Sequence, residues 1–196
     1  PAVDTAIYSA VGTDTVSYGV ARSAQDTGNL GYKLALDGGL TVSVEAARNT
    51  SAGGTDNTYG VTYTGIDGLT LAAGTGMTAT GGTAEVESTT FGVKYATGGL
   101  TFGLQLTDVE TEGTTEEEDG VYMGVTYNVN DDFTIGYLRQ ETDFSGSSSD
   151  EEHTGIQASY SMGSISFSGR VSKVDNMGGS ATASDEDKHI TMSIAF

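Results

Sequence analysis

Residues 121–129 read VYMGVTYNV, and their side chains alternate strictly in character. The apolar residues occupy the odd positions: Val121, Met123, Val125, Tyr127 and Val129. The even positions between them carry Tyr, Gly, Thr and Asn. A period of two is that of a β-strand, in which successive side chains point to opposite faces. The stretch therefore predicts a strand with one apolar face and one mostly polar face.

The same alternation recurs along the whole chain. The copies are YGVTYT (59–64), FGVKYA (91–96), LTFGLQL (100–106), DFTIGYL (132–138), GIQASYSM (155–162), SISFSGRV (164–171) and HITMSIAF (189–196). The composition agrees, because 29 Gly and 10 Tyr accompany many Thr and Ser residues, which are typical of strands and turns. We expect an all-β protein.

Charge and cysteine content exclude several classes of function. The chain has 27 acidic and 8 basic residues, a formal net charge of −19, which argues against nucleic-acid partners. It has no cysteine, so neither disulfides nor thiolate metal sites are expected. No apolar run approaches the roughly 20 residues of a membrane-spanning helix.

Short and long connections alternate between the predicted strands. Short turns are expected at 37–39, 65–68, 97–99, 130–131 and 163, and long polar loops at 48–58, 78–89, 108–120, 141–153 and 174–188. One edge of the sheet would then carry tight turns and the other edge loops. The strands would have about ten residues, which is the length of a tilted strand that crosses a bilayer, whereas strands of soluble proteins average about 5–6.

Aromatic residues are placed regularly next to the short turns. Four tyrosines precede the turns and three phenylalanines follow them, and together they predict a membrane girdle: Tyr63, Tyr95, Tyr127, Tyr160, Phe102, Phe133 and Phe167. The tyrosines recur about every 32 residues, always at positions that alternate in step with the apolar residues of their strand. Aromatic rings on the lipid-facing parity at one edge are typical of a transmembrane barrel. The alternative is that tyrosine is simply a favourable strand residue.

Other classes of β-protein also fit part of the pattern. A soluble sandwich would alternate too, with its apolar face turned to a packed core. A secreted or surface-layer structural or adhesion protein shares the Gly, Thr, Asp and Ser richness, but it would usually carry a glycine–aspartate repeat that is absent here. Enzymes are disfavoured because His153 and His189 form no known catalytic or metal-binding spacing. We predict that the protein is not an enzyme and has no catalytic residues, cofactor or metal centre.

The ten-residue strands, the acidic loops and the terminal strand HITMSIAF together resemble the general porins of Gram-negative outer membranes, especially the alphaproteobacterial type. The resemblance implies an antiparallel transmembrane β-barrel in the outer membrane. It implies a water-filled channel for passive diffusion of ions and small hydrophilic solutes, in a homotrimer surrounded by lipid and lipopolysaccharide. Phe196 would be the terminal signal that the outer-membrane assembly machinery reads, which places the short turns in the periplasm and the long loops outside.

The number of strands departs from that family. General porins close 16 strands, whereas we expect about 11–13 strands in a single barrel domain over residues 1–196, with the N-terminal strands missing. On this reading, residues 1–13 resemble the tail of the constriction loop that narrows such channels. The alternative is a complete barrel of 12 strands.

The alternation of side chains between the two faces also predicts which residues would line the lumen. The candidates are Lys33, Lys94, Arg170, Glu45, Gln105 and Gln157. Basic side chains that face acidic ones across a pore influence ion preference. The alternative is that they are ordinary solvated side chains. The acidic loops could bind divalent cations that bridge lipopolysaccharide, or they could only keep the loops solvated.

Overall fold

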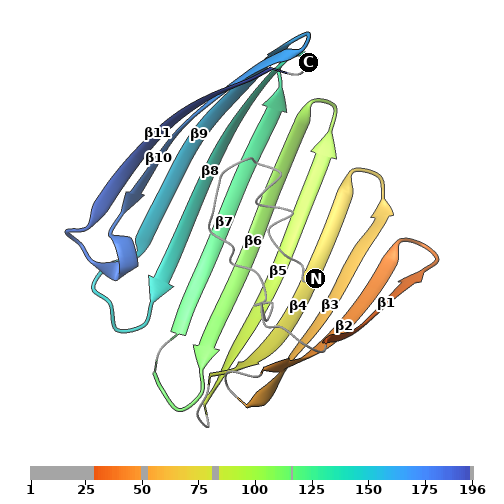
Figure 1. Cartoon of the computed structure of the whole chain (residues 1–196), viewed down its shortest axis with the longest axis vertical. Helices are drawn as coiled ribbons and strands as arrows, with labels where there is room; N and C mark the ends of the chain where they lie inside the picture. The colour runs from red at the N-terminus through yellow and green to blue at the C-terminus, as the bar shows by residue number, and fades with distance from the viewer. Residues whose placement is uncertain (1–28, 50–52, 81–83, 116, 195–196) are drawn as a thin grey trace.

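The computed structural model describes residues 29–49, 53–80, 84–115 and 117–194, which form one antiparallel sheet (Figure 1). The sheet has 11 strands in sequence order, each paired with the next, so β1 and β11 are the two edges of the described sheet. The strands are β1 (Asn29–Leu36), β2 (Leu40–Asn49), β3 (Gly54–Ile66), β4 (Leu69–Ala79), β5 (Glu85–Thr97), β6 (Leu100–Thr111), β7 (Glu117–Asn128), β8 (Phe133–Phe144), β9 (Glu151–Met162), β10 (Ile165–Asp175) and β11 (Ser184–Ile194).

The connections confirm the predicted alternation of short and long. All the tight turns lie at one end of the strands, which we call the short-turn edge, and β11 also ends there (Figure 1). The opposite end, the long-loop edge, carries the longer connections. These loops are shorter than the sequence suggested, because the strands continue into the acidic segments. For example, β7 already begins at Glu117 and β9 at Glu151.

Polar residues extend the strands because backbone pairing does not depend on an apolar side chain. Asp108 in β6 pairs with Asp119 in β7, and Glu110 pairs with Glu117, beyond Leu106 and Val121, where the alternating apolar pattern of the two strands ends. Each such pair keeps the backbone hydrogen bonds of the sheet. The strands therefore continue beyond the point at which the alternating side-chain pattern ends.

The two faces of the sheet differ sharply in exposure. In β5 to β11, every large apolar side chain that is exposed lies on the same face as Leu104 and Met123, which we call the apolar face. The opposite, polar face holds the buried side chains, including Gln105 and Gln140 at 2% and 0% exposure. A water-soluble domain has the reverse arrangement, with apolar residues inside. Within the described residues, no helix is long and apolar enough to cross a membrane.

Successive hairpins are linked at the short-turn edge by a repeated hydrogen bond. The backbone N–H of Ala96 donates to the carbonyl of Gly68 at 2.8 Å, and that of Asn128 donates to Gly99 at 2.8 Å. Gly68 has a φ of +73°, a conformation that glycine adopts without a steric penalty. A Cβ there would overlap the carbonyl oxygen of Ala96. The turn glycine thus allows one hairpin to approach the next.

At the long-loop edge, the loop between β10 and β11 is hydrogen-bonded to the loop between β8 and β9 and to the start of β9. The loop between β10 and β11 contains a short 3₁₀ helix, η1 (Met177–Gly179). The side-chain amide of Asn176 donates to the carbonyl of Asp150 at 2.9 Å. The N–H of Gly178 donates to a carboxylate oxygen of Glu151 at 2.8 Å. These contacts hold the loop over the start of β9.

Candidate functional site

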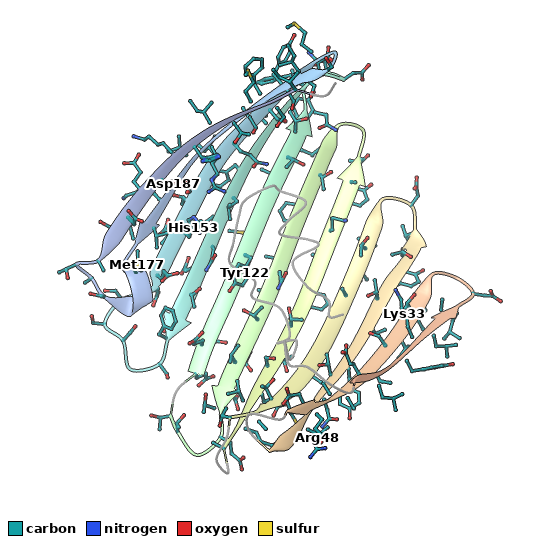
Figure 2. The ribbon with its side chains drawn as sticks, viewed as in Figure 1. Lys33, Arg48, Tyr122, His153, Met177 and Asp187 are labelled. Carbon is teal, nitrogen blue, oxygen red and sulfur yellow. The ribbon has the colours of Figure 1, made fainter. Side chains whose placement is uncertain are left out.

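A row of large polar and aromatic side chains crosses the middle of the polar face. Gln105 in β6 is paired with Tyr122 in β7, and Tyr122 is paired with Gln140 in β8. Gln140 is paired in turn with His153 in β9. Directly paired residues share a face, so all four side chains project to the same side. Figure 2 shows Tyr122 and His153 over these central strands.

This row is buried although it is polar. Gln140 donates a hydrogen bond to the hydroxyl of Thr142 at 3.3 Å, and Thr142 is 1% exposed. Buried polar groups of this kind are expected to have hydrogen-bonding partners. Of this row, only Gln105 was among the predicted lumen residues. Continuing the parity of β7, β8 and β9 would have indicated Tyr122, Gln140 and His153 as well.

Two of the predicted lumen residues, Lys33 and Glu45, lie on the polar face of β1 and β2. Lys33 is paired with Ser43, and Gly31 is paired with Glu45, so the two charged side chains are diagonal neighbours. The Glu45 side chain extends over Gly31, where a Cβ would lie 4.0 Å from its Cγ. The register thus places these opposite charges diagonally across β1 and β2, at the side of the sheet where Figure 2 labels Lys33.

Lys94 occupies a different environment on the polar face of β5. Its cross-strand partners are Thr70 in β4 and Gly103 in β6. The row continues to Gly124 in β7. Among the predicted lumen cations, Lys94 is the one that has no acidic residue directly opposite or diagonal to it in the described sheet.

Arg170 and Gln157 lie opposite one another on the polar face of β10 and β9. The guanidinium of Arg170 forms an ion pair with Asp187 in β11, with an N–O distance of 3.3 Å. Gln157 lies against Gly136 in β8, where a Cβ would come 3.1 Å from its Cγ. The missing side chain at Gly136 thus provides the space for Gln157. All six predicted lumen residues share the polar face, and their role in a pore stays a prediction.

The seven predicted girdle residues lie on the apolar face near the short turns. Phe102 is paired with Tyr95, and Tyr160 is paired with both Phe133 and Phe167. Directly opposite aromatic side chains stabilise a sheet by roughly 0.2–1 kcal/mol a pair. Tyr63 and Tyr127 are paired with leucines. The placement is that of a ring along one edge, and its contact with a membrane stays a prediction.

Phe196, the predicted assembly signal, and residues 1–13, the predicted loop tail, lie outside the described residues. The terminal strand is described as far as Ile194, which is paired with Ile165 at the start of β10.

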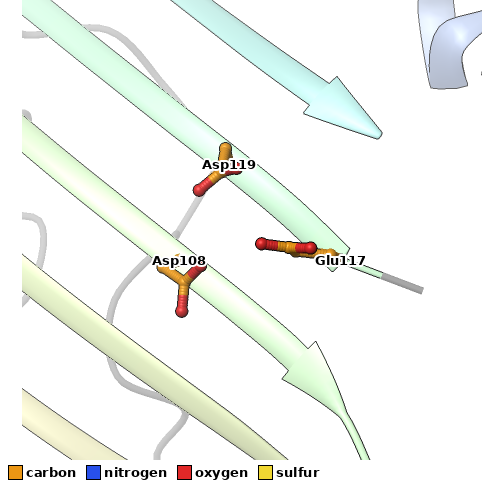
Figure 3. Close-up of side chains that lie close together, drawn as sticks. All are labelled: Asp108, Glu117 and Asp119. Carbon is orange, nitrogen blue, oxygen red and sulfur yellow. The ribbon is translucent and has the colours of Figure 1, made fainter. Parts of the chain in front are cut away.

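The acidic segments also form a cluster on the apolar face, beyond its last apolar residues. Carboxylate oxygens of Asp108, Glu117 and Asp119 lie within 4.8 Å of one another (Figure 3). Like charges directly opposite each other destabilise a sheet unless a cation or a partner compensates them. Oxygen ligands of this type suit Ca²⁺ or Mg²⁺. Exposed carboxylates also occur without metal, so cation binding here stays a prediction.

Together, the exposed apolar face and the sheltered polar face define a class of protein. An antiparallel meander of 8–13-residue strands with this distribution is the wall of a transmembrane β-barrel. A model of the Gram-negative porin family matches residues 3–196, so the chain belongs to that family. Family membership places the protein in the outer membrane.

Solved structures show the same fold at low sequence identity. An anion-selective porin from Comamonas acidovorans aligns with a TM-score of 0.72 and 15% identity, covering 86% of this chain and 59% of that protein. A porin structure refined at 1.8 Å aligns with a TM-score of 0.68 and 15% identity, covering 85% and 60%. OmpT, an outer membrane protein of Vibrio cholerae, aligns with a TM-score of 0.55 and 17% identity, covering 84% and 60%.

The chain spans about 60% of the length of these three proteins. No curated protein sequence matched the chain. The resemblance to porins expected from the sequence is confirmed, and so is the all-β antiparallel fold.

Proposed function

We propose that the protein forms a water-filled channel for passive diffusion of ions and small hydrophilic solutes across the outer membrane. The observation that carries this proposal is the division of the sheet into two faces. The apolar face exposes large side chains such as Ile135 and Tyr137, at 41% and 43%, which require lipid rather than water. The polar face, with its charged and amide side chains, can then line an aqueous lumen.

A channel is supported over an enzyme by the family and by the arrangement of the two histidines. His153 is paired with Gln140 and Val174, and His189 is paired with Arg170. Neither arrangement is the nucleophile and base that acyl transfer requires. The secreted or surface-layer alternative would need another partner to cover the whole apolar face.

The charges of the polar face support a modest preference for cations. Arg170 is already compensated by Asp187, and Lys33 lies diagonal to Glu45. Lys94 is the predicted lumen cation that has no acidic residue opposite or diagonal to it in the described sheet. With a formal net charge of −19 on the chain, the entrance would attract cations more than anions.

The partners that we propose are outer-membrane lipid and lipopolysaccharide, the outer-membrane assembly machinery, and two further copies in a homotrimer. One support for the trimer is that OmpT of Vibrio cholerae is described in a trimer form. Divalent cations at the acidic segments are a further proposed ligand, with Asp108, Glu117 and Asp119 as the candidates.

The test is single-channel recording of the purified protein in a planar bilayer under a salt gradient. We expect large ohmic steps that occur in threes, and a reversal potential of the sign that indicates cation preference. The Lys94→Glu variant should shift the reversal potential further in that direction. Folded protein that gives no steps would contradict the channel, and an anion-selective reversal potential would contradict the proposed preference.

A further inference from the structure

Three basic residues form the first charged layer beyond the apolar residues on the strands at one side of the sheet. On the apolar face of β8, Tyr137 is followed by Arg139. On β10, Val171 is followed by Lys173, and on β11, counted from the short-turn edge, Ile190 is followed by Lys188. We call Arg139, Lys173 and Lys188 the basic tier. It lies between the apolar side chains and the long-loop edge, next to the last apolar residue on each strand.

The register of the sheet gathers the basic tier into one patch. Arg139 is paired with Thr154 in β9, and Thr154 is paired with Lys173. Two strand spacings separate Arg139 from Lys173, about 10 Å. Lys173 is paired with Glu186, two residues from Lys188, so the two lysines are diagonal neighbours roughly 7–8 Å apart. The sequence alone could not show this grouping, because it depends on the cross-strand register.

Each member of the tier has a carboxylate partner on the apolar face, farther from the apolar residues. Arg139 pairs with Glu141 at 3.1 Å and with Glu152 at 3.3 Å. Lys173 pairs with Asp175 at 2.6 Å, and Lys188 pairs with Glu186 at 2.9 Å. The basic side chains are 39%, 56% and 67% exposed, in the order Arg139, Lys173, Lys188. Exposed ion pairs of this kind are weak, about 0–1 kcal/mol, and can exchange for another anion.

On the neighbouring strands β5, β6 and β7, the charged residues at this level are acidic instead. On the apolar face, the first charged residues beyond the apolar ones are Glu87 in β5, Asp108 in β6 and Asp119 in β7. The cations are therefore not spread evenly around the sheet at this level. Within β5 to β11 they are confined to the side formed by β8, β10 and β11. Arg48 in β2 is a separate cation on the apolar face, at the other side of the described sheet.

We propose that the basic tier binds the phosphate groups of an outer-leaflet lipid, namely those of lipopolysaccharide. A phosphate lies at the boundary between hydrocarbon and headgroup, which is where the tier begins. The planar guanidinium of Arg139 can donate two hydrogen bonds to one phosphate, while the lysines supply mobile point charges. Their alkyl stems can lie along the apolar residues below. This inference rests on the proposed membrane placement and specifies which residues contact the lipid.

The experiment measures binding of purified lipid A to the delipidated protein in detergent, with a chelator present, by native mass spectrometry. The test variant is Arg139→Gln/Lys173→Gln/Lys188→Gln. The matched control removes three cations from the polar face instead: Lys33→Gln/Lys94→Gln/Arg170→Gln. Each cation near an anionic lipid surface strengthens binding about fivefold, so the test variant should bind on the order of 100-fold more weakly, and the control should bind like wild type.

A second variant should strengthen lipid A binding instead of weakening it, so a general loss of folding could not imitate its effect. Glu141→Gln/Asp175→Asn/Glu186→Gln removes carboxylates that compete for the tier, so it should bind lipid A more tightly than wild type. Equal binding by the test and control variants would overturn the proposal. So would weaker binding by the carboxylate variant, or loss of wild-type binding on chelation, because either indicates bridging by divalent cations.

Conductance separates this inference from the proposed channel. The test variant should conduct like wild type, since its substitutions lie on the apolar face. A wild-type protein that conducts no ions would contradict the channel, whereas the lipid A titration would still decide the role of the basic tier.

Discussion

A single arginine placed on either face of β6 should have opposite consequences for stability. Leu104 lies on the apolar face, paired with Val93 and Met123. It is four residues beyond Leu100, where the strand begins, which corresponds to about 13 Å along the strand. With a strand tilt of roughly 40°, this places Leu104 about 10 Å into an apolar band about 25 Å tall, close to the middle. Leu104→Arg should therefore cost about 2–4 kcal/mol.

The matched control is Thr101→Arg, three residues away on the polar face of the same strand. Thr101 is paired with Ala96 and Thr126, whose side chains are small. In water, a solvated arginine should change stability by no more than about 0.5 kcal/mol. Equilibrium urea unfolding in lipid vesicles, followed by circular dichroism, gives both values. A cost for Thr101→Arg equal to or above that for Leu104→Arg would refute the assignment of the two faces.

Two pairs of variants test the short-turn edge and the long-loop edge. Gly68→Ala should lower the free energy of unfolding by about 3 kcal/mol, because a left-handed alanine costs about 1–2 kcal/mol and its Cβ would also displace the hydrogen bond from Ala96. Gly98→Ala, also at positive φ but with nothing within 4 Å of the added Cβ, should lose only the first part, and equal losses would contradict the role of the contact. Glu151→Ala should release the loop held through Gly178 and increase its cleavage by added protease, while Glu152→Ala, on the opposite face, should not. Equal cleavage of the two variants would argue against this loop contact.

The strand pattern could be predicted from the sequence because a membrane wall imposes it on every strand. Each strand must present one face to lipid, so the period of two persists through residues such as those of VYMGVTYNV. The tight turns were equally visible, since positions such as Gly68 and Gly98 require a positive φ. These signals are local, and a local pattern can be read from the chain directly.

The extent of the strands and the grouping of the site residues could not be predicted in the same way. The apolar pattern of β7 ends at Val121, but the strand continues to Glu117 because backbone pairing persists among polar residues. The neighbours of Arg139 depend on the register of β8 with β9 and β10. Register is a long-range property that the turns determine, so charged residues far apart in the sequence meet without a local signal.

The most direct test of the central claim is conductance measured on single-cysteine variants. The natural chain contains no cysteine, so each variant carries one reactive thiol. Variants across β6, from Thr101→Cys to Leu106→Cys, would be treated with a charged, water-soluble thiol reagent while current is recorded in a planar bilayer. A channel lined by the polar face predicts that the current falls for alternate positions, beginning with Thr101→Cys, and stays unchanged for the positions between them. Current that responds regardless of parity, or no current from folded protein, would contradict the account.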